Sequence, residues 1–213
     1  MERHLIAFEG PIGVSKTDVV RRVAEQLDAT TVLDEAAQNP FLQSFYEGRP
    51  GAALQTELFL LLSRYRQQQE LLQRRLFSGP TLVDYVFERS KLFAYLNLDD
   101  NELLIFDKLF SLLAESVPRP DLVVYLQSPL DSLTRRVRER GREEETHLSE
   151  EYVAEVNQAY NYYFFHYTQT PLLVVNIADV DLVGRSDDLE DLVKQIRQMG
   201  KGTRYYVPLG SKR

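Results

Sequence analysis

The chain has 213 residues, of which 44% are hydrophobic and 27% are charged, a composition that suits one soluble domain with a buried core. Its net charge of −7 makes a nucleic-acid polymer an unexpected partner, and the lack of cysteine excludes disulfides and cysteine-based chemistry. The three histidines are scattered and do not resemble a metal site. No uncharged run is long enough for a signal peptide or a membrane span, so we expect a cytoplasmic protein without a membrane partner.

Apolar segments of strand length alternate with segments of helical periodicity along the chain. We predict strands at Leu5–Phe8, Thr31–Leu33, Thr81–Asp84, Leu122–Leu126 and Leu172–Asn176. We predict helices at Lys16–Leu27, Ala53–Phe77, Asp100–Glu115, Leu130–Arg140, Ser149–Tyr167 and Asp187–Met199. This alternation is typical of an α/β fold with a mostly parallel sheet covered on both faces. Ligands of such sheets bind at the carboxyl ends of the strands, so the residues after each strand are the candidates for a site.

The first strand leads directly into residues 10–17, which read Gly-Pro-Ile-Gly-Val-Ser-Lys-Thr. In the pattern G-x-x-x-x-G-K-[ST], backbone N–H groups and a helix N-terminus point at phosphate oxygens. Lys16 would reach the outer phosphates, and the Thr17 hydroxyl would bind Mg²⁺. Ser15 departs from the pattern, because glycine at that position allows close backbone approach. The alternative is a chance match, which the preceding strand, the following helix and Gly13 disfavour.

Carboxylates follow the second and third strands. Asp34 and Glu35 come after the second strand, where a carboxylate could accept a proton from an attacking hydroxyl or could simply cap a helix. Asp84 ends the third strand, and an acid at this place commonly works through the metal, directly or through water. Glu88 and Arg89 follow four residues later. A solvated loop is the alternative for this region.

An arginine cluster follows the fourth strand. Residues 135–142 hold five arginines in eight positions, and three glutamates follow. Arg136 and Arg140 share one helix face, and Gly141 loosens the helix before Arg142. Guanidinium groups match phosphate oxygens, so this segment is predicted to be a lid over the phosphate loop. A solvated basic face paired with the glutamates is the alternative. The basic tail, residues 200–213, is expected to be a mobile or edge-docked terminus.

These segments together resemble the deoxynucleoside kinase family, of the deoxyadenosine/deoxyguanosine/deoxycytidine kinase type in its bacterial branch. The resemblance extends from Ile6 to about Ile196. The segments that carry it are Phe8-Glu9-Gly10-Pro11-Ile12-Gly13, Asn39-Pro40-Phe41-Leu42, Phe45-Tyr46-Glu47, Leu62-Ser63-Arg64-Tyr65-Arg66-Gln67, Asp84-Tyr85-Val86-Phe87, Phe93-Ala94, Arg140-Gly141-Arg142, Phe164-Phe165-His166-Tyr167 and Val174-Val175-Asn176. The family implies a P-loop kinase fold, with a five-stranded parallel sheet flanked by helices and an arginine-rich lid. It also implies a kinase domain over residues 1–199, with the lid at about 136–148.

The resemblance also implies roles for single residues. Glu35 resembles the general base that takes the proton from the sugar 5′-hydroxyl, and Gln55 the glutamine that hydrogen-bonds the base. Tyr46 and Glu145 resemble the pair that holds the 3′-hydroxyl, while Arg89 supplies a cation beside either Asp84 or Glu88. The lid arginines would be Arg136, Arg140 and Arg142. The residues expected to hold the nucleotide are Gly10, Ile12, Gly13, Val14, Ser15, Lys16, Thr17 and Asp179, with Thr17 and Asp84 at the metal.

The expected activity is ATP-dependent phosphorylation of the 5′-hydroxyl of a deoxynucleoside, a purine deoxynucleoside being the first choice, for nucleotide salvage. ATP and Mg²⁺ are the expected cofactors, and a homodimer is expected from the family. One rival is a nucleoside monophosphate kinase of the thymidylate type, which the acidic Glu35 at the acceptor site disfavours. A second rival is a non-catalytic nucleotide-binding subunit, which only Ser15 supports.

Overall fold

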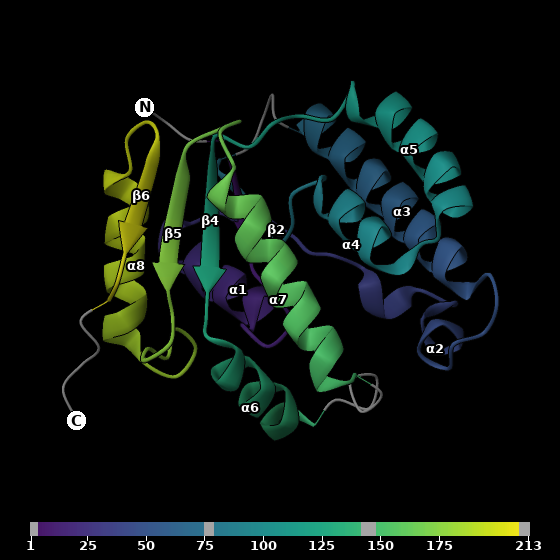
Figure 1. Cartoon of the computed structure of the whole chain (residues 1–213). Helices are drawn as coiled ribbons and strands as arrows, with labels where there is room; N and C mark the ends of the chain where they lie inside the picture. The colour runs from purple at the N-terminus through teal and green to yellow at the C-terminus, as the bar shows by residue number, and fades with distance from the viewer. Residues whose placement is uncertain (1–3, 75–78, 142–147, 209–213) are drawn as a thin grey trace.

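The computed structural model describes residues 4–74, 79–141 and 148–208. Within them, six parallel strands form one sheet in the order β2-β3-β1-β4-β5-β6 (Figure 1). The strands are β1 (Leu5–Glu9), β2 (Thr30–Val32), β3 (Thr81–Val83), β4 (Leu122–Gln127), β5 (Leu172–Asn176) and β6 (Thr203–Tyr206). The predicted parallel α/β sheet is confirmed, but the prediction of five strands was one short. The sixth strand lies in the expected tail and pairs with β5 at the edge of the sheet.

Eight α-helices accompany the sheet in the described part of the chain. They are α1 (Lys16–Leu27), α2 (Leu42–Tyr46), α3 (Ala52–Arg74), α4 (Arg89–Asn97), α5 (Asp100–Ala114), α6 (Leu130–Arg140), α7 (Glu150–Phe165) and α8 (Ser186–Gln198). The six predicted helices are present, and α2 and α4 are two further helices that the sequence pattern does not predict. In that part of the chain, no helix is long and apolar enough to cross a membrane.

The central strands are buried on both faces because helices cover both. Ile6 and Phe8 of β1 belong to the core beneath α1 and α8, whereas Leu5 and Ala7 belong to the core beneath α7. Figure 1 shows α7 in front of the sheet and α1 behind it. Side chains alternate between the faces of a strand, so a fully apolar strand fits only between two helical layers.

A third cluster of apolar side chains, which includes Leu61, Ala94 and Phe106, joins α3, α4 and α5. Figure 1 shows these three helices beside the sheet. Asp99 begins α5 with a capping box, in which its carboxylate accepts the backbone N–H groups of Asn101 and Glu102. This cluster holds α3 and α4 beside the carboxyl end of the sheet.

The chain reverses direction across the sheet at β1. From β1 it passes to β2 and β3 on one side, and β4, β5 and β6 then follow on the other side. Such a switch point leaves a crevice at the carboxyl ends of the two diverging strands, β3 and β4, next to β1. The loop at residues 10–15 leaves β1 at this crevice, so the fold alone predicts a ligand there.

Candidate functional site

The loop between β1 and α1 packs closely against neighbouring backbone at two glycines. A Cβ atom at Gly10 would lie 2.7 Å from the carbonyl oxygen of Leu126, and one at Gly13 would lie 3.0 Å from that of Leu133. Gly13 also has a φ of 97°. Ser15, the N-cap of α1, has φ 53° and ψ 38°, which lies in the left-handed region. That conformation costs a non-glycine residue about 1–2 kcal/mol, so Ser15 keeps the loop geometry at the expense of strain.

Lys16 lies at the base of this loop. Its Nζ donates to the carbonyl oxygen of Gly10 at 2.7 Å, which folds the side chain back along the loop. Burial, reinforced by the nearby Arg89 cation, lowers the pKa of Lys16 to about 8. The N-terminus of α1 has no side-chain cap, so its backbone N–H groups remain available to an anion. Loop, lysine and helix end together form a site for phosphate oxygens.

Asp84 connects the phosphate loop to the exits of β2 and β3. One carboxylate oxygen accepts from the Thr17 hydroxyl at 2.6 Å, and the other accepts from the backbone N–H of Asp34 at 2.6 Å. The side chain is buried, with 2% exposed. A hydroxyl and a carboxylate in contact beside a phosphate loop are oxygen ligands of the kind that Mg²⁺ takes together with substrate phosphates. This donor set therefore fits a magnesium ion.

Asp34 is the buried carboxylate of the site. Its two oxygens accept from Arg64 Nη2 at 2.8 Å and from Arg64 Nε at 3.3 Å, and Arg89 Nη1 lies 3.8 Å away. The Asp34 side chain is 8% exposed. Burial alone would raise its pKa, but the Arg64 and Arg89 guanidinium groups hold the pKa of Asp34 below its ordinary value. The site therefore contains an ionised carboxylate at neutral pH.

Glu35 points elsewhere. Its carboxylate accepts from the Ser63 hydroxyl and from Arg66, both at 2.9 Å, and its side chain is 28% exposed. Glu35 does not line the cavity at the phosphate loop, whereas Asp34 does. The contacts with Ser63 and Arg66 turn the Glu35 carboxylate toward α3 in this structure, while its role as the general base stays a prediction.

A cavity of about 570 Å³ opens beside the phosphate loop at the carboxyl ends of the strands. One end is polar, formed by residues 11–17 with Asp34, Asp84 and Arg89. The other end is formed by α2, α3, α4 and α7 and combines apolar and aromatic side chains with the polar Glu57 and Asn97. Its side chains include Leu42, Phe45, Tyr46, Leu60, Phe93 and Tyr152. Tyr46 lines the cavity, and its role at the sugar 3′-hydroxyl stays a prediction.

A hydrogen-bonded chain crosses the apolar end of the cavity. The Tyr152 hydroxyl donates to Asn97 Oδ1 at 3.1 Å, and Asn97 Nδ2 donates to Glu57 Oε1 at 2.8 Å. Burial raises the pKa of Glu57 to about 7. Gln55 was expected to contact a base here, but its side chain is exposed and does not line the cavity. Glu57, two positions further along α3, does line the cavity, and the role of Gln55 at the base stays a prediction.

Sequence analysis assigned no role to Glu57, Arg64, Asn97 or Tyr152. One signal was present in the sequence. Glu57 and Arg64 are seven residues apart, so they share one helix face, and the apolar residues Leu60 and Leu61 lie between them on that face. Charged residues are almost never fully buried unless they are paired, so such a face indicates a site.

The arginine helix α6 lies beside the loop, and its residues have different positions. Arg136 donates through Nη2 to the carbonyl oxygens of Ile177 at 2.9 Å and Val180 at 3.3 Å. It therefore fastens the loop after β5, in which Asp179 is exposed, and does not line the cavity. Arg140 does line the cavity, and its role as a lid arginine stays a prediction. The predicted site residues Arg142 and Glu145 lie outside the described residues.

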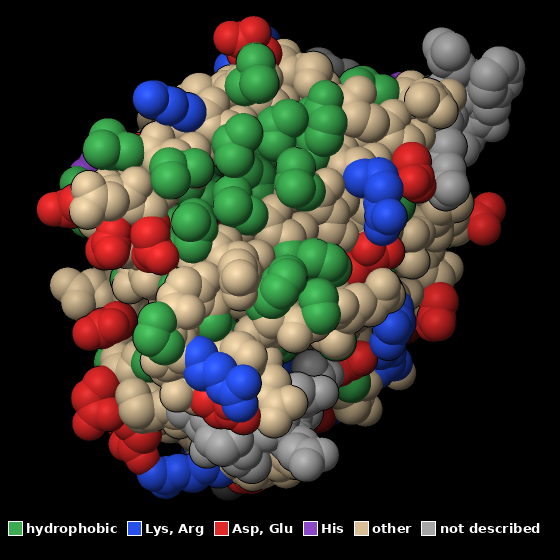
Figure 2. Space-filling view, turned by 90° about the vertical axis from the view of Figure 1, so that its right-hand side faces the viewer, with side chains coloured by type: hydrophobic (Ala, Val, Ile, Leu, Met, Phe, Trp, Pro, Cys, Tyr) green, Lys and Arg blue, Asp and Glu red, His purple; other side chains and the backbone are tan. Residues whose placement is uncertain are grey.

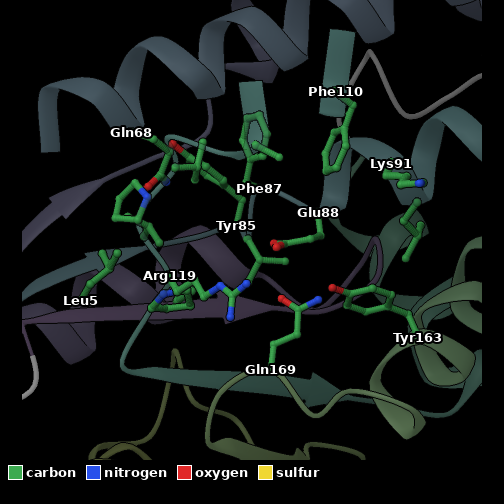
Figure 3. A pocket seen from close by; sticks show the side chains of 18 of the residues that line it. Leu5, Gln68, Tyr85, Phe87, Glu88, Lys91, Phe110, Arg119, Tyr163 and Gln169 are labelled. Carbon is green, nitrogen blue, oxygen red and sulfur yellow. The ribbon is translucent and has the colours of Figure 1, made fainter. Parts of the chain in front are cut away.

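Asp84 and Glu88, the two candidate acids beside Arg89, line different cavities. Asp84 lies in the cavity at the phosphate loop, whereas Glu88 lines a separate and larger cavity of about 750 Å³. Figure 3 shows Glu88 and Gln169 turned toward each other there, with Arg119 and Tyr163 close by. Burial raises the pKa of Glu88. Residues 10–17 do not line this larger cavity, so the phosphate site is the smaller one despite the difference in volume.

Comparisons with known proteins agree with this geometry. The family model described as "Deoxynucleoside kinase" matches residues 6–200. The chain is 27% identical to the deoxyadenosine/deoxycytidine kinase of Bacillus subtilis, over 90% of this chain and 91% of that protein. It is also 27% identical to the deoxyguanosine kinase of the same organism, over 91% of this chain and 96% of that protein. A deoxyadenosine kinase from M. mycoides, solved with bound dATP, superposes with a TM-score of 0.75 at 17% identity, covering 92% of this chain and 99% of that one.

Proposed function

Because this chain belongs to the deoxynucleoside kinase family, we propose that it transfers the terminal phosphoryl group of ATP to the 5′-hydroxyl of a deoxynucleoside. The observation that carries the proposal is the two-ended cavity. Its polar end joins a phosphate loop to a buried, ionised carboxylate, and its apolar end has the aromatic lining suited to a planar base. A phosphate donor and a nucleoside acceptor could meet between the two ends.

The phosphate loop and Lys16 would hold the ATP phosphates. The loop offers backbone N–H groups, and the N-terminus of α1 adds its dipole. Lys16 would exchange its hydrogen bond to the Gly10 carbonyl for phosphate oxygens, which favour the charged form of the amine. This exchange would raise the pKa of Lys16 from about 8. Arg140 reaches the same cavity from α6 and adds positive charge where the transferred group passes.

Thr17 and Asp84 are the residues that fit a magnesium ion. When bound, such an ion neutralises phosphate charge. The Thr17 hydroxyl and the Asp84 carboxylate already lie 2.6 Å apart, so the two ligands are positioned by each other. Asp84 also accepts the backbone N–H of Asp34, which fixes the distance between the metal ligands and the proposed base.

Asp34 is the proposed general base for the acceptor hydroxyl. Its carboxylate lies in the cavity and is ionised, whereas Glu35 is held outside by Ser63 and Arg66. A carboxylate with a low pKa is a weak base, so Asp34 would chiefly orient the 5′-hydroxyl and accept its proton late in the transfer. This role suits phosphoryl transfer, in which positioning and electrostatics dominate. Arg64 and Arg89 would hold the carboxylate in place.

We further propose that the protein is a homodimer. Large apolar side chains are exposed on helices, among them Leu104 and Ile105 on α5 and Tyr162 and Phe165 on α7. Figure 2 shows hydrophobic side chains gathered on one face of the molecule. Contiguous exposed apolar surface of this kind marks interaction sites. Light scattering after size exclusion would report a dimer, and Ile105→Glu and Phe165→Glu, tested separately, would show which helix forms the contact. A monomer at micromolar concentration would refute this proposal.

A coupled ADP-release assay tests the activity. It would contain Mg-ATP and each of the four deoxynucleosides in turn, with adenosine, guanosine and thymidine monophosphates as comparison acceptors. The proposal predicts ADP release with at least one deoxynucleoside and none above background with the monophosphates. Turnover confined to a monophosphate would assign the protein to the thymidylate-type rival instead.

A further inference from the structure

Glu57 lines the cavity and leaves one carboxyl oxygen without a hydrogen-bond partner among the described residues. Its side chain is buried, with 2% of the residue exposed, and Oε2 has no hydrogen-bond partner among the described residues. Oε1 is already engaged, because Asn97 Nδ2 donates to it at 2.8 Å. A buried, unpaired carboxyl oxygen costs stability, so a group of this kind needs an explanation. A bound ligand that donates a hydrogen bond to Oε2 would satisfy this oxygen and so explain its position.

The neighbouring hydrogen bonds show which atoms donate and which accept around Glu57. Tyr152 donates its hydroxyl proton to Asn97 Oδ1, so the Asn97 amide must present its Nδ2 donor to Glu57. Glu57 Oε1 is therefore an acceptor, with a second lone pair still available. An ionised Glu57 would present two acceptor oxygens side by side to the cavity. Phe93 and Phe45 line the same cavity and offer apolar rings for a planar molecule.

We propose that Glu57 reads the base of the acceptor and selects guanine, an inference that rests on the proposed kinase function. Guanine presents the N1–H and N2–H₂ donors next to each other, matching the two oxygens of a carboxylate. Adenine and cytosine instead place a ring-nitrogen lone pair beside their amino group, and that lone pair would face Oε2. Thymine has one N–H between two carbonyl oxygens. Hypoxanthine keeps N1–H but lacks the amino group.

The charges around Glu57 permit the ionised form. Arg64 from α3 and Arg89 from α4 favour ionisation, whereas Asp34 after β2 opposes it. Tyr152 from α7, which contacts the same Asn97 amide, is neutral because burial raises its pKa above the ordinary value. With the pKa of Glu57 at about 7, the carboxylate form predominates above neutral pH. Donation by guanine N1–H to Oε2 would stabilise the charged form further.

The test compares the wild type with Glu57→Gln by measuring kcat/KM for deoxyguanosine, deoxyinosine, deoxyadenosine and deoxycytidine. Asn97 would still donate to the glutamine carbonyl, so the new Nε2 donor would stand where Oε2 stood. The glutamine side chain then offers one acceptor and one donor, which match the amino group and the ring nitrogen of adenine or cytosine. Its Nε2 donor would face the N1–H donor of guanine, and two donors cannot form a hydrogen bond. We expect the ratio of deoxyguanosine to deoxyadenosine kcat/KM to fall at least tenfold in the variant. We also expect deoxyinosine to be at least tenfold poorer than deoxyguanosine in the wild type.

Glu155→Gln is the matched control, because Glu155 is exposed on α7 and does not line the cavity. It should keep the wild-type ratio. In the wild type the ratio should rise about tenfold from pH 6 to pH 8 as a group with a pKa near 7 ionises, and it should be flat in Glu57→Gln. Titration of groups that affect kcat/KM equally for both deoxynucleosides, such as Lys16, cancels in this ratio.

The outcomes separate the two claims. Turnover with an unchanged ratio in Glu57→Gln would overturn the inference and leave the kinase function intact. A wild type that prefers deoxyadenosine or deoxycytidine would also overturn it. If no deoxynucleoside is turned over, the kinase function fails, and calorimetric binding of deoxyguanosine to wild type and variant then decides the inference. Equal binding to both, or binding to neither, would count against it.

Discussion

Asp34→Asn and Glu35→Gln form a matched pair of isosteric changes at adjacent residues. Asp34 faces the cavity and Glu35 faces away, so the two changes should differ sharply. Loss of a positioned acid–base group typically lowers turnover by about 10²–10⁴-fold, and we expect Asp34→Asn to lower kcat within that range. Glu35→Gln should leave kcat within about threefold of the wild type. The coupled ADP-release assay at saturating ATP and acceptor measures both.

The same pair should differ in stability. Asp34 pairs with Arg64, and the two side chains are 8% and 2% exposed, so its neutralisation leaves a buried guanidinium without its counter-ion. Breaking a buried pair from one side costs about 3–5 kcal/mol. Glu35 pairs with Arg66, whose side chain is 66% exposed, and exposed pairs contribute about 0–1 kcal/mol. Because the pKa of Asp34 is depressed, its contribution is present at neutral pH and is lost as pH falls below the unfolded value, near 4.

Thermal unfolding followed by circular dichroism at pH 7 gives the second measurement. For a domain of this size, about 3–5 kcal/mol corresponds to a Tm lower by roughly 6–20 °C. Low activity of Asp34→Asn would then be interpreted only at temperatures well below its own Tm. The reasoning is refuted if Glu35→Gln loses turnover by a hundredfold or more while Asp34→Asn keeps it, because Glu35 would then be the base.

Three further predictions concern the loop, the lysine and the sheet edge. ATP affinity, measured by calorimetry, should weaken as pH rises from 7 to 9, because Lys16 loses its charge above its pKa of about 8; an affinity independent of pH would contradict this account. Ser15→Gly removes a left-handed strain of about 1–2 kcal/mol, so ATP affinity should be kept or improved, and a tenfold weaker affinity would show that the Ser15 side chain contacts the nucleotide. Truncation after Gly202 removes β6 and uncovers the backbone groups of β5, so Tm should fall by several degrees, and an unchanged Tm would mean that the β5–β6 pairing adds no stability.

Elements whose sequence carries several agreeing signals were predicted closely. The α1 helix and the α6 helix begin and end at the predicted residues, because each follows a strand, has a strongly amphipathic pattern and ends at a turn residue, Asp28 or Gly141. β6 was missed because its residues are mostly exposed and lack an apolar pattern, so only pairing with β5 defines the strand. Helix α4 was missed because its apolar residues follow no clear helical period.

The site residues show a different limit. Asp34 and Glu35 are neighbours with the same charge, and the direction of each depends on how the chain leaves β2. Gln55 and Glu57 are both polar and differ by about 200° around the helix axis, so the rotation of α3 decides which of them reaches the cavity. That rotation is set by packing of α3 against α4 and α5, which is a tertiary property. Local pattern places a motif on an element, and packing then selects the side chain that faces the ligand.

The most direct test of the account is identification of the products by ³¹P NMR. The enzyme would be incubated with Mg-ATP and deoxyguanosine, and the spectrum followed until the ATP signals change. The account predicts equal amounts of ADP and deoxyguanosine 5′-monophosphate, with no inorganic phosphate above the enzyme-free control. Inorganic phosphate in place of the nucleoside monophosphate would show hydrolysis and contradict the proposed transfer. An unchanged spectrum with deoxyguanosine and with each of the other deoxynucleosides would also contradict it.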